Sequence, residues 1–197
     1  MKTLLFVDCC ISQRRLASRT RALAEGYLEA FRAAHPDWEV ERVDLSALAL
    51  PPLTAEFLDR RDSLAAAGSF EDSVFDLARQ FQRADAVLVA APYWDMSYPA
   101  QLKTYIEHIS ANGLCYHYEA DGVHGDCRAE RLVYLTSGGD LERPGSIGVL
   151  HWRQLCAMFD ISRFDYVFAG GLDLEAERTA ALLDGALKKA RALAESC

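Results

Sequence analysis

Hydroxyl and guanidinium side chains are concentrated in one short segment near the amino terminus. Between residues 12 and 20 lie three hydroxyl-bearing residues, Ser12, Ser18 and Thr20, together with three arginines that include Arg19. Hydroxyl donors beside the backbone N–H groups of a helix amino terminus form a phosphate-binding cradle. The segment contains neither G-x-x-x-x-G-K-[ST] nor G-x-G-x-x-G, so it predicts neither an ATPase loop nor a dinucleotide loop. Helix capping by Ser18 above a solvated basic loop is the plainer alternative.

A second segment combines aromatic rings with proline. Residues 91–99 read Ala-Pro-Tyr-Trp-Asp-Met-Ser-Tyr-Pro. Proline stiffens the backbone and aromatic rings offer flat apolar surfaces, so we expect this segment to hold a planar ring against stiff backbone N–H groups. The alternative is a rigid, partly buried turn that binds nothing. The residues expected to contact such a ring are Pro92, Tyr93, Trp94, Asp95 and Met96.

A third segment, Thr136-Ser137-Gly138-Gly139-Asp140, is rich in small residues. Two adjacent glycines allow the backbone to approach a ligand plane closely, and a plain turn is again the alternative. We take Ser137, Gly138 and Gly139 as the candidate contacts. In an open α/β sheet, ligands bind beyond the carboxyl ends of the strands. The three segments each follow an expected strand, so they are expected to meet at one place.

Apolar runs alternate with helix-period segments along the chain, which predicts an α/β fold with a parallel sheet. The second apolar run alternates polar with apolar residues, as an edge strand does, whereas the first, third and fourth runs suit central strands. We therefore expect five strands in the order 2-1-3-4-5. The expected strands are residues 3–7, 38–43, 85–91, 131–136 and 163–169, and the expected helices are residues 18–32, 71–82, 98–110, 147–159 and 175–195.

Two segments do not fit this alternation. Residues 45–69 form a long excursion, and such excursions commonly act as lids or interfaces. Residues 113–126 contain Asp121-Gly122 between short β-prone runs, which predicts a hairpin. The whole chain, residues 1–197, is expected to form a single domain, since its length is typical of one.

Composition excludes several classes of partner. The chain carries 29 acidic and 21 basic residues, for a net charge of −8, which argues against a general nucleic-acid binder. No apolar run approaches the roughly 20 residues of a membrane span, and the amino-terminal residues lack the features of a signal peptide. We expect a cytoplasmic protein without a nucleic-acid or membrane partner. Six cysteines without a C-x-x-C pair and five histidines without ligand spacing predict no metal site.

In their order along the chain, the three segments resemble those of the FMN-dependent NAD(P)H oxidoreductases, the azoreductases and quinone reductases of flavodoxin-like fold. Ser12 and residues 18–20 match the FMN phosphate loop of that family. Residues 93–96 match its second flavin loop, and residues 136–139 match its third. The resemblance covers most of the chain and implies a flavodoxin-like three-layer sandwich. The second loop is its most specific part.

The chain departs from the family pattern at two positions. Azoreductases often carry Asn where Asp95 stands, and Arg where Ser137 stands. A carboxylate at position 95 can accept a hydrogen bond from the flavin N3–H but repels the flavin carbonyl oxygens. The resemblance therefore implies a flavin pocket whose hydrogen bonds differ in detail from those of the family.

The resemblance implies FMN as cofactor and NADH or NADPH as co-substrate. Hydride passes from the nicotinamide to the flavin and then to an acceptor that occupies the slot the nicotinamide has left. Such an acceptor is flat and aromatic, a quinone or an azo compound. No catalytic side chain is implied, because the flavin performs the chemistry. Backbone N–H groups of Gly138 and Gly139 are candidate donors to the flavin N1 and O2 atoms.

Two other functions are left open by the residues. Cys9 and Arg15 are separated by five residues, as in the C-x5-R loop of low-molecular-weight tyrosine phosphatases, where a thiolate attacks phosphorus. Leu16 stands where those loops carry Ser or Thr, and the chain has no Asp-Pro dipeptide to supply their general acid. A flavodoxin-type electron carrier is the other alternative, although a carrier needs neither the long first loop nor the 45–69 excursion.

The excursion also predicts a homodimer. It carries five large apolar residues that have no place in the minimal fold, and a second subunit could bury them and form one wall of the flavin site, as the resemblance also implies. These residues are Leu48, Leu50, Leu53, Phe57 and Leu58.

Overall fold

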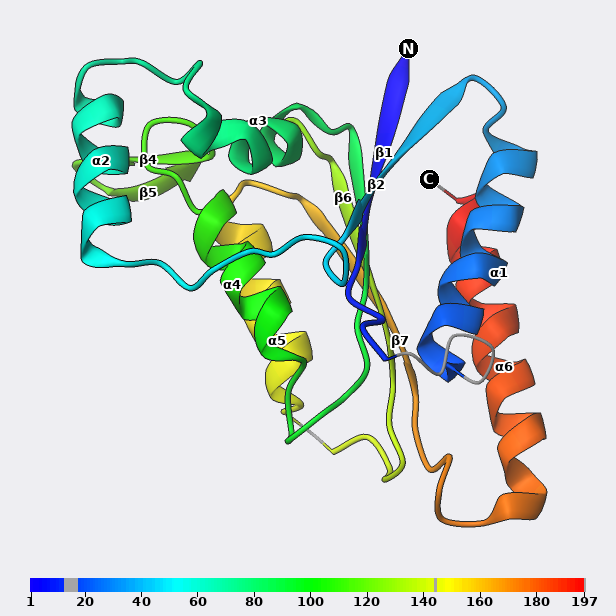
Figure 1. Ribbon diagram of the computed structural model, residues 1–197. Coiled ribbons are helices and arrows are strands. Elements are labelled where there is room, and N and C mark those ends of the chain that lie inside the picture. Colours follow the sequence, from blue (N-terminus) through cyan, green and yellow to red (C-terminus); the bar gives the residue numbers. More distant parts are fainter. Residues whose placement is uncertain (13–17, 144, 197) are drawn as a thin grey trace.

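A computed structural model describes residues 1–12, 18–143 and 145–196 of the chain. Five parallel strands form one sheet between two layers of helices (Figure 1). This is the α/β, flavodoxin-like architecture that the sequence predicts. The sheet strands are β1 (Lys2–Asp8), β2 (Trp38–Asp44), β3 (Ala86–Ala90), β6 (Arg131–Ser137) and β7 (Arg163–Ala169).

The strand order is β2-β1-β3-β6-β7, and every neighbouring pair is parallel. This is the expected five-strand layout, but the numbers 2-1-3-4-5 are wrong for the last two strands. Two further strands precede them in the chain and pair only with each other, as an antiparallel hairpin of β4 (Tyr116–Glu119) and β5 (Gly122–Gly125). The hairpin falls inside the 113–126 segment and leaves the sheet order unchanged.

Each face of the sheet buries its own apolar core because successive strand residues point to opposite sides. On β1, Leu5 and Val7 face one helical layer, whereas Leu4 and Phe6 face the other. The helices against Leu4 and those against Leu5 lie on opposite sides of the sheet in Figure 1. These helices are α1 (Arg19–Ala34) and α6 (Ala176–Glu195), and then α3 (Asp76–Arg83), α4 (Ala100–Ile109) and α5 (Ile147–Met158).

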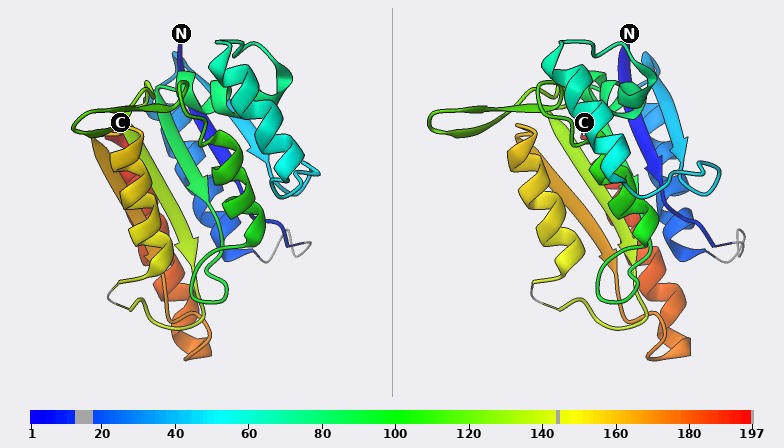
Figure 2. Two further views of the ribbon diagram at one scale, coloured as in Figure 1. Left: turned by 90° about the vertical axis from the view of Figure 1, so that its left-hand side faces the viewer. Right: turned by 60° about the vertical axis from the view of Figure 1, so that its left-hand side comes forward.

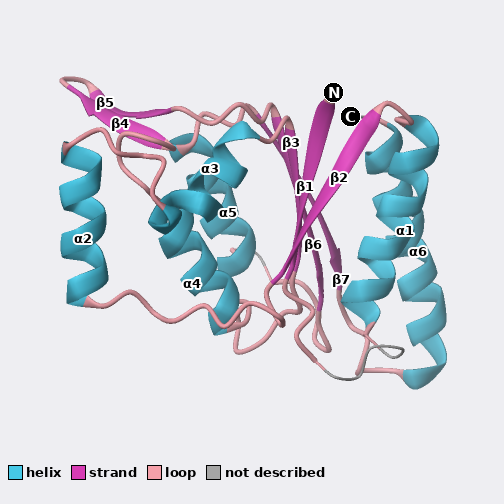
Figure 3. Ribbon diagram, turned by 45° about the horizontal axis from the view of Figure 1, so that its top comes forward, coloured by secondary structure: helices cyan, strands magenta, loops and turns pink. Residues whose placement is uncertain are grey.

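The 45–69 excursion contains a helix that the sequence pattern does not predict, α2 (Ala55–Ala66). Thr54 caps it, since its side-chain oxygen accepts a hydrogen bond from Phe57 N at 3.2 Å. No residue of α2 is fully buried. A helix outside the core needs no continuous apolar stripe, so its apolar residues do not recur at the helical spacing that marks a core helix. The Phe57 ring packs on the His108 ring of α4 with centroids 4.9 Å apart, which places α2 outside the α4 layer (Figure 3).

Two of the expected helices begin later in the chain than predicted. The segment expected to be helical from residue 71 begins with a short 3-10 turn, Ser73–Phe75, which Asp72 caps by accepting from Val74 N at 3.0 Å. The helix expected from residue 98 begins at Ala100, because Pro99 occupies its N-cap position. Within the described ranges, no helix is long and apolar enough to cross a membrane.

Glycine at position 125 lets the hairpin base lie against the end of α5. A Cβ atom added there would lie 2.0 Å from the carbonyl carbon of Phe159 and 2.2 Å from the amide nitrogen of Asp160. We predict that Gly125→Ala lowers the free energy of unfolding by about 3 kcal/mol or more, because backbone atoms cannot move aside as a side chain can. Urea unfolding followed by circular dichroism measures this change.

A matched control is available on α6. A Cβ added at Gly185 meets nothing within 4 Å, so Gly185→Ala should raise stability by about 0.5–1 kcal/mol through better helix propensity. Equal unfolding midpoints for Gly125→Ala and the unaltered chain would contradict the close packing of the hairpin base.

Candidate functional site

The three predicted segments meet at the carboxyl edge of the sheet, because β1, β3 and β6 are neighbouring parallel strands. Backbone hydrogen bonds continue past the strand ends, from Cys9 N to Ala90 O at 2.8 Å and from Tyr93 N to Ser137 O at 2.9 Å. In both views of Figure 2 the three loops lie together at the lower end of the sheet. This edge is the candidate functional site.

The first loop leads into the amino terminus of α1. Ser18 is the N-cap residue, and its Oγ accepts a hydrogen bond from Arg21 N at 3.3 Å. The amides of Arg19 and Thr20 have no acceptor inside the helix, as is usual for a first turn. Ser12 and Ser18 are half-buried, and residues 13–17, including Arg15, lie outside the described residues. Ser18 therefore caps the helix, as the plainer alternative predicts. The amides of the first helical turn can also bind an anion.

A hydrogen bond joins the first loop to the third. Thr20 Oγ1 and Ser137 Oγ lie 2.6 Å apart, and Thr20 is buried. Thr20 and Ser137 thus lie side by side although they are 117 positions apart in the sequence. The two hydroxyls fix the spacing between the α1 amino terminus and the end of β6.

Arg19 points toward the loop that follows β7. Its Nη1 donates to Asp173 Oδ1 at 2.7 Å, and Asp173 N donates to Gly139 O at 3.1 Å. Asp173 therefore lies between the first and third loops and neutralises the arginine predicted to face a phosphate. Asp173 belongs to no sequence motif that predicts a site, although an acidic residue just after the last strand lies at the edge where ligands bind.

A buried carboxylate organises the start of the first loop. Asp8, the last residue of β1, is 1% exposed. Its Oδ1 accepts from Cys10 N at 2.9 Å, and its Oδ2 accepts from Arg21 Nη1 at 3.0 Å and from Arg42 Nη2. Arg21 Nη2 also donates to Cys10 O at 2.9 Å. Arg42 Nη2 also lies 3.7 Å from Asp44 Oδ2, so two guanidinium groups and two carboxylates balance each other at this corner of the site.

The second loop has a strained backbone. Asp95 and Met96 have φ angles of 50° and 66°, in the left-handed region that residues other than glycine seldom adopt. Reciprocal hydrogen bonds between Trp94 and Ser97, at 3.2 and 2.8 Å, hold the turn. Trp94, Asp95 and Met96 are exposed at its tip, whereas Pro92 and Tyr93 are half-buried. The turn therefore presents an indole ring and a thioether to the solvent side of the site.

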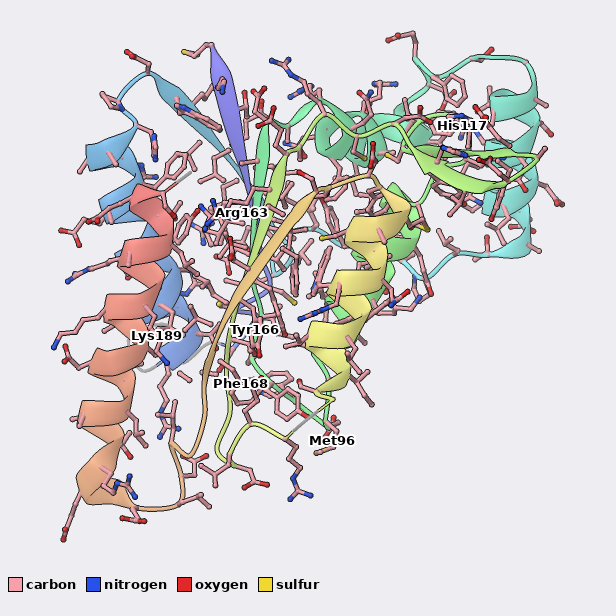
Figure 4. All side chains as sticks on the ribbon, turned by 180° about the vertical axis from the view of Figure 1, so that it is seen from behind. Met96, His117, Arg163, Tyr166, Phe168 and Lys189 are labelled. Atoms are coloured by element: carbon pink, nitrogen blue, oxygen red, sulfur yellow. The ribbon has the colours of Figure 1, made fainter. Side chains whose placement is uncertain are left out.

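In the third loop, the prediction that the Gly138 amide donates to a ligand is wrong. Gly138 N donates to Ala169 O at 3.0 Å, so this amide extends the sheet and is not a donor to a ligand. The glycine instead permits close packing, because a Cβ at 138 would lie 3.2 Å from the Phe168 ring and 3.3 Å from the Tyr93 ring. These two rings meet edge to face with centroids 5.0 Å apart. Figure 4 shows Phe168 and Met96 at this same end of the molecule.

A tyrosine–histidine pair joins the second loop to α5. The Tyr98 hydroxyl is hydrogen-bonded to His151 Nδ1, and the two rings stack with centroids 5.9 Å apart. Burial lowers the pKa of His151 below its usual value, and nearby Lys103 lowers it further. Because burial also raises the pKa of Tyr98, both groups are uncharged at neutral pH.

The Cys9 thiol is buried and un-ionised. Its exposed fraction is 0%, and burial, with the neighbouring Asp8 carboxylate, raises its pKa to about 12. Burial and Asp8 also raise the pKa of Cys10. A phosphatase nucleophile must be an accessible thiolate, so the structure does not support the phosphatase alternative.

The family comparison matches nearly the whole chain. A family model described as flavodoxin-like fold matches residues 2–194. The FMN-dependent NADH:quinone oxidoreductase 2 of Clostridium acetobutylicum is 30% identical over 179 residues, which cover 88% of this chain and 89% of that protein. The FMN-dependent NADH:quinone oxidoreductase of Methylorubrum populi is 30% identical over 200 residues, covering 96% and 98%.

Solved structures share the same fold. An azoreductase from Bacillus anthracis superposes with a TM-score of 0.88 at 21% identity and covers 100% of both chains. An FMN-dependent NADH-azoreductase from Bacillus anthracis, solved in complex with FMN, has a TM-score of 0.85 at 14% identity and covers 100% of this chain and 99% of that one.

Thiol labelling tests the assignment of Cys9. With a pKa of about 12, this thiol is ionised in roughly one molecule in ten thousand at pH 8. We predict that iodoacetamide leaves Cys9 unmodified in the folded chain and modifies it after unfolding in urea, as measured by peptide mass spectrometry. Rapid labelling of Cys9 in the folded chain, or an aryl phosphatase activity that Cys9→Ser abolishes, would revive the phosphatase alternative.

Proposed function

Since this chain belongs to the flavodoxin-like fold family, and within it to the FMN-dependent NADH:quinone oxidoreductases, we propose that FMN binds at the carboxyl edge of its sheet. The enzyme transfers hydride from NAD(P)H by way of FMN to a planar acceptor, a quinone or an azo compound. The observation that carries the placement is the hydrogen bond between Thr20 and Ser137, which closes the first and third loops on each other. No finding supports an electron carrier or a phosphatase.

The first loop fits the phosphate end of FMN. The amides of Arg19 and Thr20 lie at the start of α1, where the helix dipole stabilises a bound anion. The Arg21 guanidinium lies beside this loop, and its buried Nε has no partner among the described residues. Ser12 and Ser18 supply further hydroxyl groups. We assign the phosphate to this group of donors, with Arg19 acting through its ion pair with Asp173 rather than by direct contact.

The second and third loops fit the ring system. Residues 92–96 bring the exposed Trp94 and Met96 side chains to the site, and Gly139 offers a backbone amide at the end of β6. The Ser146 hydroxyl, at the N-cap of α5, is buried without a partner among the described residues. We assign Gly139 and Ser146 as donors toward the polar edge of the ring, and Asp95 as an acceptor from the flavin N3–H.

FMN supplies the redox chemistry, since it accepts hydride from a nicotinamide and gives it up to an acceptor. Tyr98 and His151 form an uncharged pair, and exposed apolar side chains follow the same edge, so the surface favours planar aromatic molecules. The exposed apolar residues at this edge are Trp94, Met96, Leu141, Ile147 and Leu150.

Thr20→Val tests the loop closure. Valine keeps the volume of threonine but removes the hydroxyl that bonds to Ser137, and one hydrogen bond contributes about 1–1.5 kcal/mol. We predict that FMN binds the unaltered chain and that Thr20→Val weakens binding about tenfold, as measured by quenching of flavin fluorescence. NADH:quinone activity at limiting FMN should fall in parallel.

Thr3→Val is the matched control, because it makes the same change at the opposite edge of the sheet. It should leave FMN affinity unchanged. A purified chain that does not bind added FMN at micromolar concentration would refute the proposed cofactor, and equal affinities for the Thr20 and Thr3 variants would refute the proposed placement.

We also propose that the enzyme is a homodimer whose second subunit covers the 45–69 excursion. Leu48 is 40% exposed, and the apolar residues Leu53, Phe57 and Leu58 are only half-buried. A second copy would remove this apolar surface from water. Multi-angle light scattering should give twice the chain mass at micromolar concentration. A Leu48→Glu/Leu58→Glu variant should shift that mass toward the monomer, whereas a monomeric unaltered chain would contradict the proposal.

A further inference from the structure

The β4–β5 hairpin gathers histidines and carboxylates on one of its faces. His117 lies directly opposite His124 in the antiparallel register. Because side chains alternate along a strand, Glu119 falls on the same face as His117. Asp121 in the turn and Asp126 after β5 complete the group. The opposite face carries aromatic and apolar side chains, Tyr116, Tyr118 and Val123.

These side chains are already in contact. His124 Nε2 lies 2.8 Å from Asp121 Oδ1, and the His117 ring nitrogens lie 2.8 Å from Asp126 Oδ2 and 3.2 Å from Glu119 Oε1. The two imidazole rings stack with centroids 5.7 Å apart. One ligand atom from each of Glu119, Asp121 and His124 lies within 4.8 Å of the other two.

Within the part of the chain that the structure describes, the negative charge of this group is balanced only by its own two histidines. Among the described residues, the ion pairs of Glu119, Asp121 and Asp126 are made only with His117 and His124. No lysine or arginine in those ranges pairs with them. With neutral imidazoles the group carries three negative charges, and a divalent cation would offset most of this charge.

We propose that Glu119, Asp121 and His124 bind a zinc ion, with His117 and Asp126 positioning Glu119. Zinc accepts imidazole nitrogen and carboxylate oxygen at about 2.0–2.2 Å in tetrahedral sites, so two ligand atoms lie about 3.4 Å apart. Atoms within 4.8 Å of one another on exposed side chains reach this spacing by small rotations. An imidazole ligand disfavours Ca²⁺ and Mg²⁺, which prefer oxygen. Zinc displaces the proton shared by His124 Nε2 and Asp121 Oδ1, which leaves to solvent.

The zinc site is separate from the proposed flavin site. The hairpin leaves the fold near the amino edge of the sheet (Figure 3), and Figure 4 shows His117 at the opposite end of the molecule from Met96 and Phe168. The ion would join the two hairpin strands to their turn. With three protein ligands, the fourth position would be filled by water, and zinc binding at the hairpin is independent of FMN.

Equilibrium dialysis of the full chain against zinc chloride, with metal measured by mass spectrometry, tests the site. We expect one zinc ion per chain. His124→Ala and Asp121→Asn should each weaken binding about 100-fold, and His117→Gln about 10-fold, because loss of a residue that orients a ligand commonly costs about 10–100-fold.

Glu25→Gln is the charge control, since it removes one exposed carboxylate from α1 and should leave zinc affinity unchanged. Circular dichroism and FMN content, recorded for every variant, separate loss of the site from loss of the fold or of the flavin. Absence of saturable zinc binding, equal binding by His124→Ala, or displacement of zinc by equimolar Ca²⁺ would each overturn the proposal.

Discussion

The carboxylate of Asp8 is the interaction on which the candidate site depends most. It ends the second strand of the sheet order, accepts a hydrogen bond from the Cys10 amide in the loop that follows, and binds guanidinium groups from α1 and β2. A buried charge is tolerated only when it is paired and hydrogen-bonded. The Asp8 carboxylate therefore fixes β1, the loop after it, α1 and β2 relative to one another. The start of the first loop takes its position from the sheet rather than from a ligand.

Hydrogen bonds between the loops extend this fixed region across the site. Hydrogen bonds from Tyr93 to Ser137, and from Gly138 to Ala169, carry the sheet beyond its strands. The Thr20–Ser137 hydroxyl pair then ties the last sheet residue of β6 to α1. Among the described residues, the parts of the second and third loops next to the sheet are therefore held by backbone hydrogen bonds, whereas residues 94–96 form an exposed turn. Rigid placement of binding groups is what lets a cofactor be oriented without a large loss of chain entropy.

Features with a strong local pattern could be predicted from the sequence, and features created by contact between distant residues could not. The continuous apolar runs of β1, β3 and β6 mark buried parallel strands, and their carboxyl ends locate the candidate site. Helix α2 escaped prediction because none of its residues is fully buried. The ion pair of Arg19 with Asp173 joins residues 154 positions apart. The hairpin group needs the register of His117 with His124, which no spacing along the chain reveals.

The left-handed turn at Asp95 and Met96 lowers the stability of the fold and at the same time places two side chains at the candidate site. Residues other than glycine in this conformation cost of order 1 kcal/mol or more each, and Asn-Gly would occupy a turn of this kind with less strain. Selection for thermal tolerance alone would therefore drift toward Asn-Gly here and would discard the carboxylate and the thioether. The two residues that strain the backbone are thus the ones whose side chains the turn exposes at the site, so relieving the strain and keeping both side chains are incompatible.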